Sequence, residues 1–168
     1  MKKTLLLTLL IIALSFSSKA QQNSVKLIEV SGNTTSNIRL VSEFVEAYVY
    51  QSAIDLSSLD VQSKKQAFIN LMLPSILIAK HEIEQKRRAV LELVNKNEEL
   101  SDAEENYLND LKKSYKCSTN TDLLSRLRTH PVSIVIAQAA IESGWGTSRF
   151  YREANNVFGV WSYNKNEA

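Results

Sequence analysis

The stretch 129–159, THPVSIVIAQAAIESGWGTSRFYREANNVFG, is the part of the sequence that most constrains the fold. Nearly every residue from 132 to 141 is apolar and small, which predicts a helix that is apolar on all sides and packed by neighbours all round. Thr129 is the expected N-cap of this helix, and Pro131 suits its first turn. Two glycines within residues 143–146 predict a sharp stop after it.

Glu142 is a single carboxylate near the end of this apolar helix. The negative end of the helix dipole and partial burial beside Trp145 would both disfavour its charged form and raise its pKa. A carboxyl group that keeps its proton near neutral pH can act as a general acid. Gln138 lies one turn earlier on the same face and could orient it. The alternative is a solvated charge at a helix end, and spacing alone favours that alternative because structural charges outnumber catalytic ones.

The motif AQAAIESGWGTSRF, followed by NNVFG, resembles the signature of the bacterial glucosaminidase family, glycoside hydrolase family 73. Residues 64–163 resemble more closely the Bax-type members, in which a charged helical hairpin precedes this motif. The resemblance implies a mainly α fold, a lysozyme-like helical domain preceded by a long helical hairpin. It also implies cleavage of the glycan strands of peptidoglycan, most readily as an endo-β-N-acetylglucosaminidase, with Glu142 as the general acid.

The same resemblance implies that the turn at 155–159 lines the glycan groove. Aromatic side chains near the motif could stack on sugars, although packing explains them equally well. We favour surface charge over ligand contact for the arginines of the predicted short helix at 148–153. The expected substrate-side residues are Gln138, Trp145, Asn156, Phe158, Trp161 and Tyr163.

In the family the domain continues beyond the position of Ala168, where it holds the other wall of the groove and a second candidate carboxylate. The resemblance therefore implies a chain that lacks the C-terminal lobe of the domain. Two alternatives to a glucosaminidase follow. A lytic transglycosylase shares the Glu-Ser pair at a helix end, but its usual Gly-Leu-Met-Gln stretch is replaced here by NNVFG. A non-catalytic cell-wall binding or scaffold protein would need only part of the groove.

Residues 1–20 have the pattern of a signal peptide, with Lys2 and Lys3 before the apolar run 5–16 and a Ser-Lys-Ala cleavage site ending at Ala20. The apolar run is too short for a comfortable membrane span, so no stable span is expected after cleavage. We expect export to the periplasm or the cell envelope of a bacterium. Cleavage would leave 148 residues and change the formal charge from +2 to −1, which gives no case for nucleic-acid binding.

Cys117 is the only cysteine, so no internal disulfide can form, and we expect an unreactive thiol. Two histidines and one cysteine without ligand spacing predict no metal site. Hydrolysis of a glycosidic bond needs no cofactor, so none is expected.

The remaining chain is expected to divide into a leader with a helix at 21–62, a helical hairpin at 63–116 and the N-terminal part of the glucosaminidase domain at 117–168. Within the leader, 25–30 suits a short strand. Residues 38–54 place apolar side chains at helical spacing and predict a helix, with a strand as the competing interpretation.

A long helix is expected over 64–97, and Pro74 should break or kink it. Ser101 and Glu104 form a capping-box pattern for the next helix, and the short connection predicts antiparallel packing. A short helix, capped by Thr119 or Thr121, should then run to Leu127.

Overall fold

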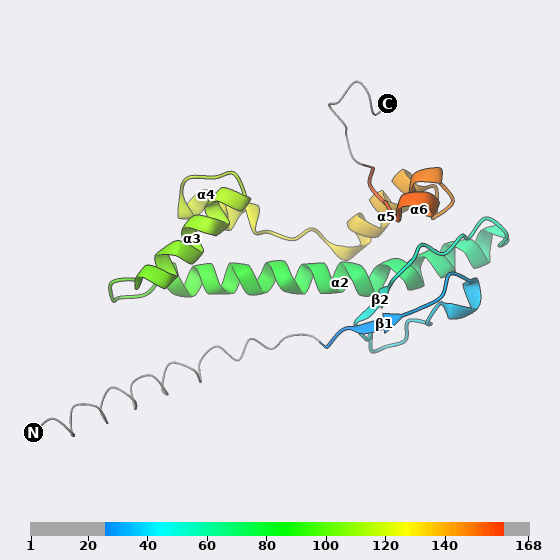
Figure 1. Cartoon of the computed structure of the whole chain (residues 1–168), viewed down its shortest axis with the longest axis horizontal. Coiled ribbons are helices and arrows are strands. Elements are labelled where there is room, and N and C mark those ends of the chain that lie inside the picture. The colour runs from blue at the N-terminus through cyan, green and yellow to red at the C-terminus, as the bar shows by residue number, and fades with distance from the viewer. Residues whose placement is uncertain (1–25, 160–168) are drawn as a thin grey trace, which may run out of the picture.

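The computed structural model describes residues 26–159, so the predicted signal peptide, Trp161 and Tyr163 lie outside the described residues. The expected mainly α fold class is confirmed, with one long helix as the axis of the molecule (Figure 1). The elements in chain order are β1 (Ile28–Val30), a 3₁₀ helix (Thr35–Asn37), β2 (Tyr48–Tyr50), α2 (Val61–Val94), α3 (Asp102–Ser114), α4 (Asn120–Arg126), α5 (Val132–Ser143) and α6 (Arg149–Ala154).

Helix α2 runs for 34 residues and begins at a well-made cap, where the Asp60 side chain accepts hydrogen bonds from two backbone amides. Of the predicted break or kink at Pro74, the break is wrong, because the helix continues through this residue. Proline removes one ladder hydrogen bond. The Pro74 side chain is fully buried, so burial of its apolar ring offsets part of that loss.

The expected helix over 38–54 is also wrong. Most of this segment is irregular, and only Tyr48–Tyr50 is regular, as strand β2 paired in parallel with β1. The predicted strand near the N-terminus is confirmed at Ile28–Val30. Phe44, which would face inward in the expected helix, is 82% exposed. Pairing with a distant strand and the β preference of Tyr-Val-Tyr outweigh the helical spacing of the apolar residues.

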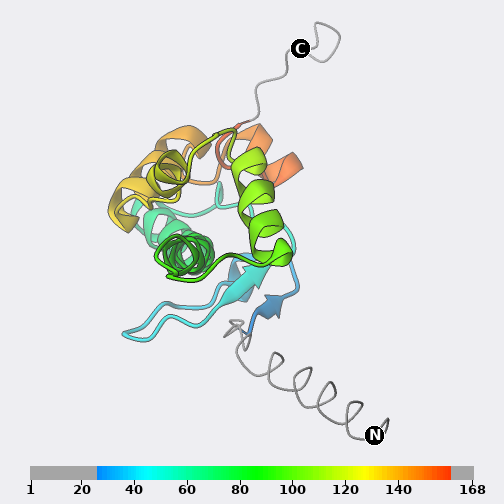
Figure 2. The ribbon, with the colours of Figure 1, turned by 90° about the vertical axis from the view of Figure 1, so that its left-hand side faces the viewer.

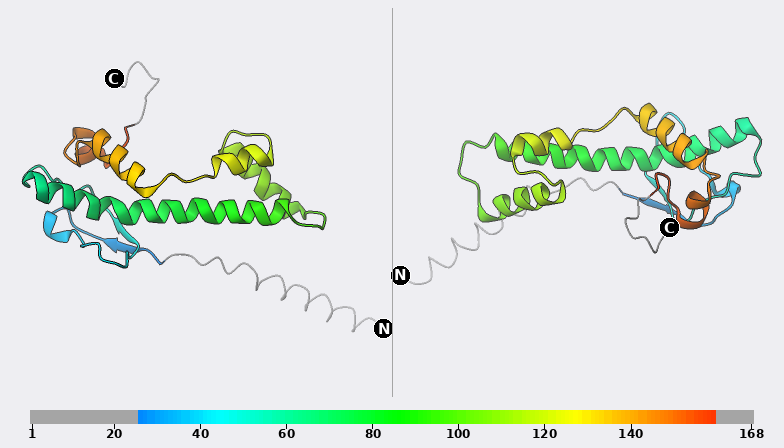
Figure 3. Two further views of the ribbon diagram at one scale, coloured as in Figure 1. Left: turned by 180° about the vertical axis from the view of Figure 1, so that it is seen from behind. Right: turned by 90° about the horizontal axis from the view of Figure 1, so that it is seen from above.

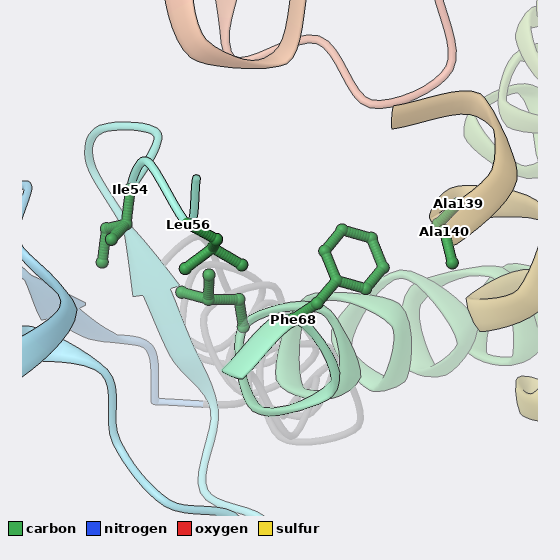
Figure 4. Packing of buried hydrophobic residues seen from close by; sticks show 6 residues of the cluster. Ile54, Leu56, Phe68, Ala139 and Ala140 are labelled. Carbon is green, nitrogen blue, oxygen red and sulfur yellow. The ribbon is translucent and has the colours of Figure 1, made fainter. Parts of the chain in front are cut away.

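Two hydrophobic clusters lie along α2. The first cluster, at its N-terminal half, consists of Ile54, Leu56, Phe68, Leu71, Ala139 and Ala140 (Figure 4). The second cluster, at its C-terminal half, consists of Val90, Leu108, Leu111, Leu123 and Leu127. Seen along the axis of α2, the strands lie on one side of this helix and α5 and α6 on the other (Figure 2).

Helix α3 begins with the predicted capping box, in which both the amide and the hydroxyl of Ser101 donate to Glu104 Oε2 at 2.8 Å. The expected antiparallel packing of α3 on α2 is wrong: α4 rather than α3 makes the larger contact with α2, and α3 crosses the axis of α2 steeply when that helix is seen end-on (Figure 2). Of the two candidate caps of α4, Thr119 is the one used, and it accepts from the Asp122 amide at 3.1 Å. Cys117 is a half-buried free thiol beside the second cluster.

Residues 127–131 connect the two ends of the molecule as an extended strap over α2, between α4 and α5 (Figure 3). This strap brings α5 back onto the N-terminal half of α2, where the first cluster forms. Within residues 26–159 no helix has the length and apolar character needed to cross a membrane.

Candidate functional site

Helix α5 carries the candidate acid and starts later than predicted. It begins at Val132, and Pro131 is its N-cap, with φ −54°, ψ 137° and no side-chain capping bond. The predicted Thr129 cap is therefore wrong. The Thr129 hydroxyl instead accepts a hydrogen bond from Lys80 Nζ of α2 at 2.7 Å, which fixes the strap to the long helix.

The expectation that α5 is packed all round is wrong in the described structure. Its buried face consists of Ala139, Ala140 and Ser143, while Ile134 is 57% exposed and Ile141 80% exposed. The physical reason is that α2 supplies the main packing surface for α5 and covers one side of it. Small alanines on that side let the two helices approach closely, and the larger isoleucines occupy the opposite side.

Glu142 lies in the last turn of α5, and its side chain is exposed rather than partly buried as predicted. Gln138 is exposed too, and the spacing of four residues places both side chains on the same strip of the helix. The structure thus presents the Glu142 carboxylate on an open face that is shared with the exposed isoleucines of α5.

Ser143, the residue after the candidate acid, is fully buried and holds the helix end together. Its Oγ donates to the Ala139 carbonyl at 2.7 Å and accepts from the Gly146 amide at 3.1 Å. Its own carbonyl accepts from the amides of Thr147 and Ser148 at 3.1 and 2.9 Å. The sequence alone did not predict this role of Ser143. The signal available was a small hydroxyl residue, able to bond four residues back, directly after the last helical turn.

The stop itself is a run of three residues with positive φ, Gly144 at 58°, Trp145 at 58° and Gly146 at 75°. The Trp145 amide donates to the Ala140 carbonyl at 2.8 Å, which closes the helix end. A side chain at Gly146 would meet Phe68 and Tyr151 at 3.2 Å.

The Trp145 ring packs toward α2. It makes an edge contact with Phe68, at 5.7 Å between ring centroids and 71° between planes, and Lys65 Nζ lies 5.4 Å from its centroid. These contacts support structural packing, one of the two interpretations of this tryptophan. Its use as a sugar platform stays a prediction.

Helix α6 begins where predicted, with Ser148 as a cap that accepts from the Tyr151 amide at 3.2 Å. Tyr151 is buried, and burial raises the pKa of its hydroxyl above the usual 10.0. Arg152 pairs with Asp55 at 3.4 Å and links α6 to the segment before α2. The pKa of Asp55 is lowered, first by the Ser57 amide that donates to it and less by Arg152. Arg149 pairs with Glu153 at 3.9 Å on the surface, which agrees with the expectation of a surface charge.

The turn after α6 starts at Asn155, which has a left-handed backbone with φ 50°. Asn156 is half-buried, and its amide donates to the Phe150 carbonyl at 3.2 Å. Phe158 is 51% exposed. Of the six predicted substrate-side residues, the structure therefore describes four, on α5, on the stop and on this turn, and their binding role stays a prediction. Among residues 26–159 no group of three or more His, Cys, Asp or Glu side chains is placed to hold a metal ion.

Comparisons with known proteins address the whole C-terminal part of the chain. Residues 117–168 match the family model Glucosaminidase, described as mannosyl-glycoprotein endo-beta-N-acetylglucosaminidase. Protein bax of Escherichia coli (strain K12) is 36% identical over 105 residues, which cover 58% of this chain and 38% of that protein. No solved structure matches the chain significantly. The two matches confirm the resemblance that the motif indicated: residues 117–168 are similar to the glucosaminidase family, and 105 residues of the chain are similar to Protein bax.

Proposed function

We propose that the chain contributes to hydrolysis of β-1,4 glycosidic bonds in peptidoglycan, as an endo-β-N-acetylglucosaminidase with Glu142 as general acid. The family match of residues 117–168, which includes the whole ESGWGTSRF motif, is the observation that carries the proposal. The pattern at 1–20 supports export to the compartment where this substrate lies.

Chemically, the Glu142 carboxyl would protonate the glycosidic oxygen as the bond to the anomeric carbon breaks and that carbon gains oxocarbenium character. The buried Ser143 supports this role, because its hydrogen bonds fix the backbone from which the Glu142 side chain extends. A fixed backbone limits the positions that the carboxyl group can reach, which is a requirement for efficient proton transfer. Gln138, on the same exposed strip, is proposed to contact the substrate or the acid.

The exposure of Glu142 favours a second candidate function. A general acid near neutral pH needs a dry or charged surrounding that holds its proton, and the described residues leave this carboxylate open to water. A chain that binds glycan strands without cutting them would need no such surrounding. The matched stretch spans 38% of Protein bax, so the activity of a whole Bax-type protein is itself part of the proposal.

Mass spectrometry of the fragments released from purified peptidoglycan tests the proposal. The chain should release fragments with N-acetylglucosamine at the reducing end, and Glu142→Gln should abolish their release. Glu153→Gln is the matched control, since Glu153 is also an exposed acid near the motif but pairs with Arg149.

Each other result identifies a different function. Reducing-end muramic acid would place the cut at the other bond, and 1,6-anhydro ends would show a lytic transglycosylase. Sedimentation of the folded chain with peptidoglycan, without any release, would establish the binding function and contradict hydrolysis by these residues.

A further inference from the structure

A groove of about 510 Å³ runs along the middle of α2, between the two hydrophobic clusters. Its floor includes Met72, Ile76, Ala79 and Ile83, which recur every three or four residues and therefore lie on one strip of the helix. At 1.5 Å per residue this strip is roughly 16 Å long. Strand β2 contributes to one side of the groove, and α5 contributes Val135 and Ala139.

The floor of this groove is unsuited to a glycan. Its floor and its α5 side are aliphatic, and a sugar placed there would leave hydroxyl groups without hydrogen-bond partners, which costs binding energy. Glu142 does not line the groove. Phe158, one of the predicted substrate-side residues, also lines the groove, together with Asn155 and Tyr151. The ligand class argued here rests on the aliphatic floor and the basic end rather than on this side, and the volume of the groove is in the range of small-molecule sites.

One end of the groove is basic. Lys80 Nζ is held there by Thr129 Oγ1 at 2.7 Å and by the His130 carbonyl at 3.1 Å, and Glu84 Oε1 lies 3.7 Å from it. Arg128 and His130 line the same end, whereas Glu84 does not line the groove. Two permanent cations and one neighbouring acid leave an excess of positive charge at this end, which favours an anionic group.

We propose that this groove binds a single-chain anionic amphiphile of the fatty-acid class, with its alkyl chain along α2 and its carboxylate at Lys80 and Arg128. An unbranched alkyl chain matches the aliphatic strip along α2, and a single carboxylate matches a basic group at one end only. The ligand would contact both α2 and the strap 127–131, so it would join the two ends of the molecule. This inference goes beyond the proposed glycosidase function and stands whether or not the chain cuts glycans.

Isothermal titration calorimetry of the 168-residue chain with octanoate, decanoate and dodecanoate, each below its micelle concentration, tests the proposal. Burial of one methylene group contributes about 0.8 kcal/mol, so affinity should rise about fourfold per methylene until the groove is full. Dodecyltrimethylammonium, which carries the same alkyl chain with a positive head, should bind more weakly than dodecanoate. Equal affinity for all three chain lengths, or tighter binding of the cation, would overturn the proposal.

Two pairs of variants locate the binding, which matters because the apolar residues 5–16 could also take up amphiphiles. Ala79 is exposed on the groove floor, so Ala79→Trp should fill the floor without disturbing either cluster and should weaken dodecanoate binding at least tenfold. Ala103→Trp, on an exposed face of α3, is the control and should bind normally. Circular dichroism would confirm that both variants are folded.

Arg128→Gln should weaken dodecanoate up to about fivefold, the effect of one exposed ion pair, and leave dodecanol unchanged. Arg88→Gln, an exposed α2 residue outside the groove lining, should change neither. Unchanged binding by Ala79→Trp would refute the groove as the site. Binding to phosphatidylglycerol vesicles without binding to monomeric dodecanoate would also overturn the proposal, because the ligand would then be a bilayer surface.

Discussion

The hydroxyl of Ser143 accepts a hydrogen bond from the amide of Gly146 at 3.1 Å, inside the turn that directly follows the candidate acid. The same oxygen donates to the Ala139 carbonyl, so one buried side chain joins the last turn of α5 to the stop. In Ser143→Ala the Gly146 amide loses its partner. We expect a loss of about 1–3 kcal/mol in the free energy of unfolding, the cost of an unsatisfied buried donor, measured by urea denaturation.

Ser133→Ala is the control for this change, because Ser133 lies exposed in the first turn of α5. Its free energy of unfolding should stay within about 0.5 kcal/mol of the parent chain. Equal stability of the two variants would show that the bonds of Ser143 do not stabilise the helix end.

Gly146→Ala tests the close packing of the stop. The new methyl group would lie 3.2 Å from both Phe68 and Tyr151, and the backbone keeps a φ of 75°. Gly159→Ala is the matched control, since φ there is 68° and no atom lies within 4 Å of the added methyl group. Strain should cost both variants about 1–2 kcal/mol, and Gly146→Ala should lose about 1–3 kcal/mol more from overpacking. Equal urea midpoints and slopes would contradict this account.

Phe68→Ala tests the first cluster. Phe68 of α2 is fully buried against α5 and the stop. Truncation of a buried phenylalanine costs about 3–5 kcal/mol in the free energy of unfolding. Phe44→Ala removes the same side chain from a position that is 82% exposed, and it should change stability by less than about 0.5 kcal/mol. Thermal denaturation followed by circular dichroism would compare the two. A similar change in both would mean that Phe68 is not a core residue.

The capping box of α3 predicts a pH dependence. The Ser101 amide, and then Lys96 at 2.9 Å, lower the pKa of Glu104 from 4.5 to about 2. A carboxyl group whose pKa is lower in the folded than in the unfolded chain stabilises the fold above the unfolded pKa, and that contribution is lost as the pH falls toward the folded value. Glu104→Gln should therefore be less stable than the parent at pH 7, and the difference should shrink between pH 4.5 and 2.

Glu105→Gln is the control for the capping box, because it removes an exposed acid from the same first turn. Urea denaturation at several pH values would measure the stability difference between each variant and the parent chain. A difference for Glu104→Gln that is constant from pH 7 to pH 2 would contradict the lowered pKa.

Local signals in the sequence predicted much of the fold. The capping box at Ser101 and the cap at Thr119, one of two candidates, are short patterns whose partners lie within four residues, and the structure confirms both. The glycines after Glu142 predicted the helix stop for the same reason, since left-handed backbone is a property of single residues.

The errors concern features that depend on distant partners. Tyr48–Tyr50 forms a strand because Ile28–Val30 lies beside it, which the helical spacing of 38–54 could not reveal. Helix α2 continues through Pro74, where burial of the proline ring offsets part of the lost hydrogen bond. The burial of α5 was overestimated because a composition that is apolar on all sides does not say which sides have neighbours, and Ile134 and Ile141 lie exposed.

The same distinction between local signals and distant partners applies to the candidate site. The motif sufficed to select Glu142, and the family match of residues 117–168 confirms the resemblance on which that choice rested. Its exposure and the packing of Trp145 on Phe68 required the tertiary structure. The groove along α2 gave no signal either, since its floor residues look like an ordinary apolar stripe in the sequence.

Helix α2 is shared by both hydrophobic clusters, with Leu71 in the first and Val90 in the second. The helix therefore fixes how one cluster is rotated about the helix axis relative to the other cluster. Deleting one residue between these positions would turn one cluster by about 100° and shift it by about 1.5 Å relative to the other. The strap 127–131 spans a fixed distance between them and could not follow such a rotation. The segment of α2 between Leu71 and Val90 should consequently tolerate substitutions far better than insertions or deletions.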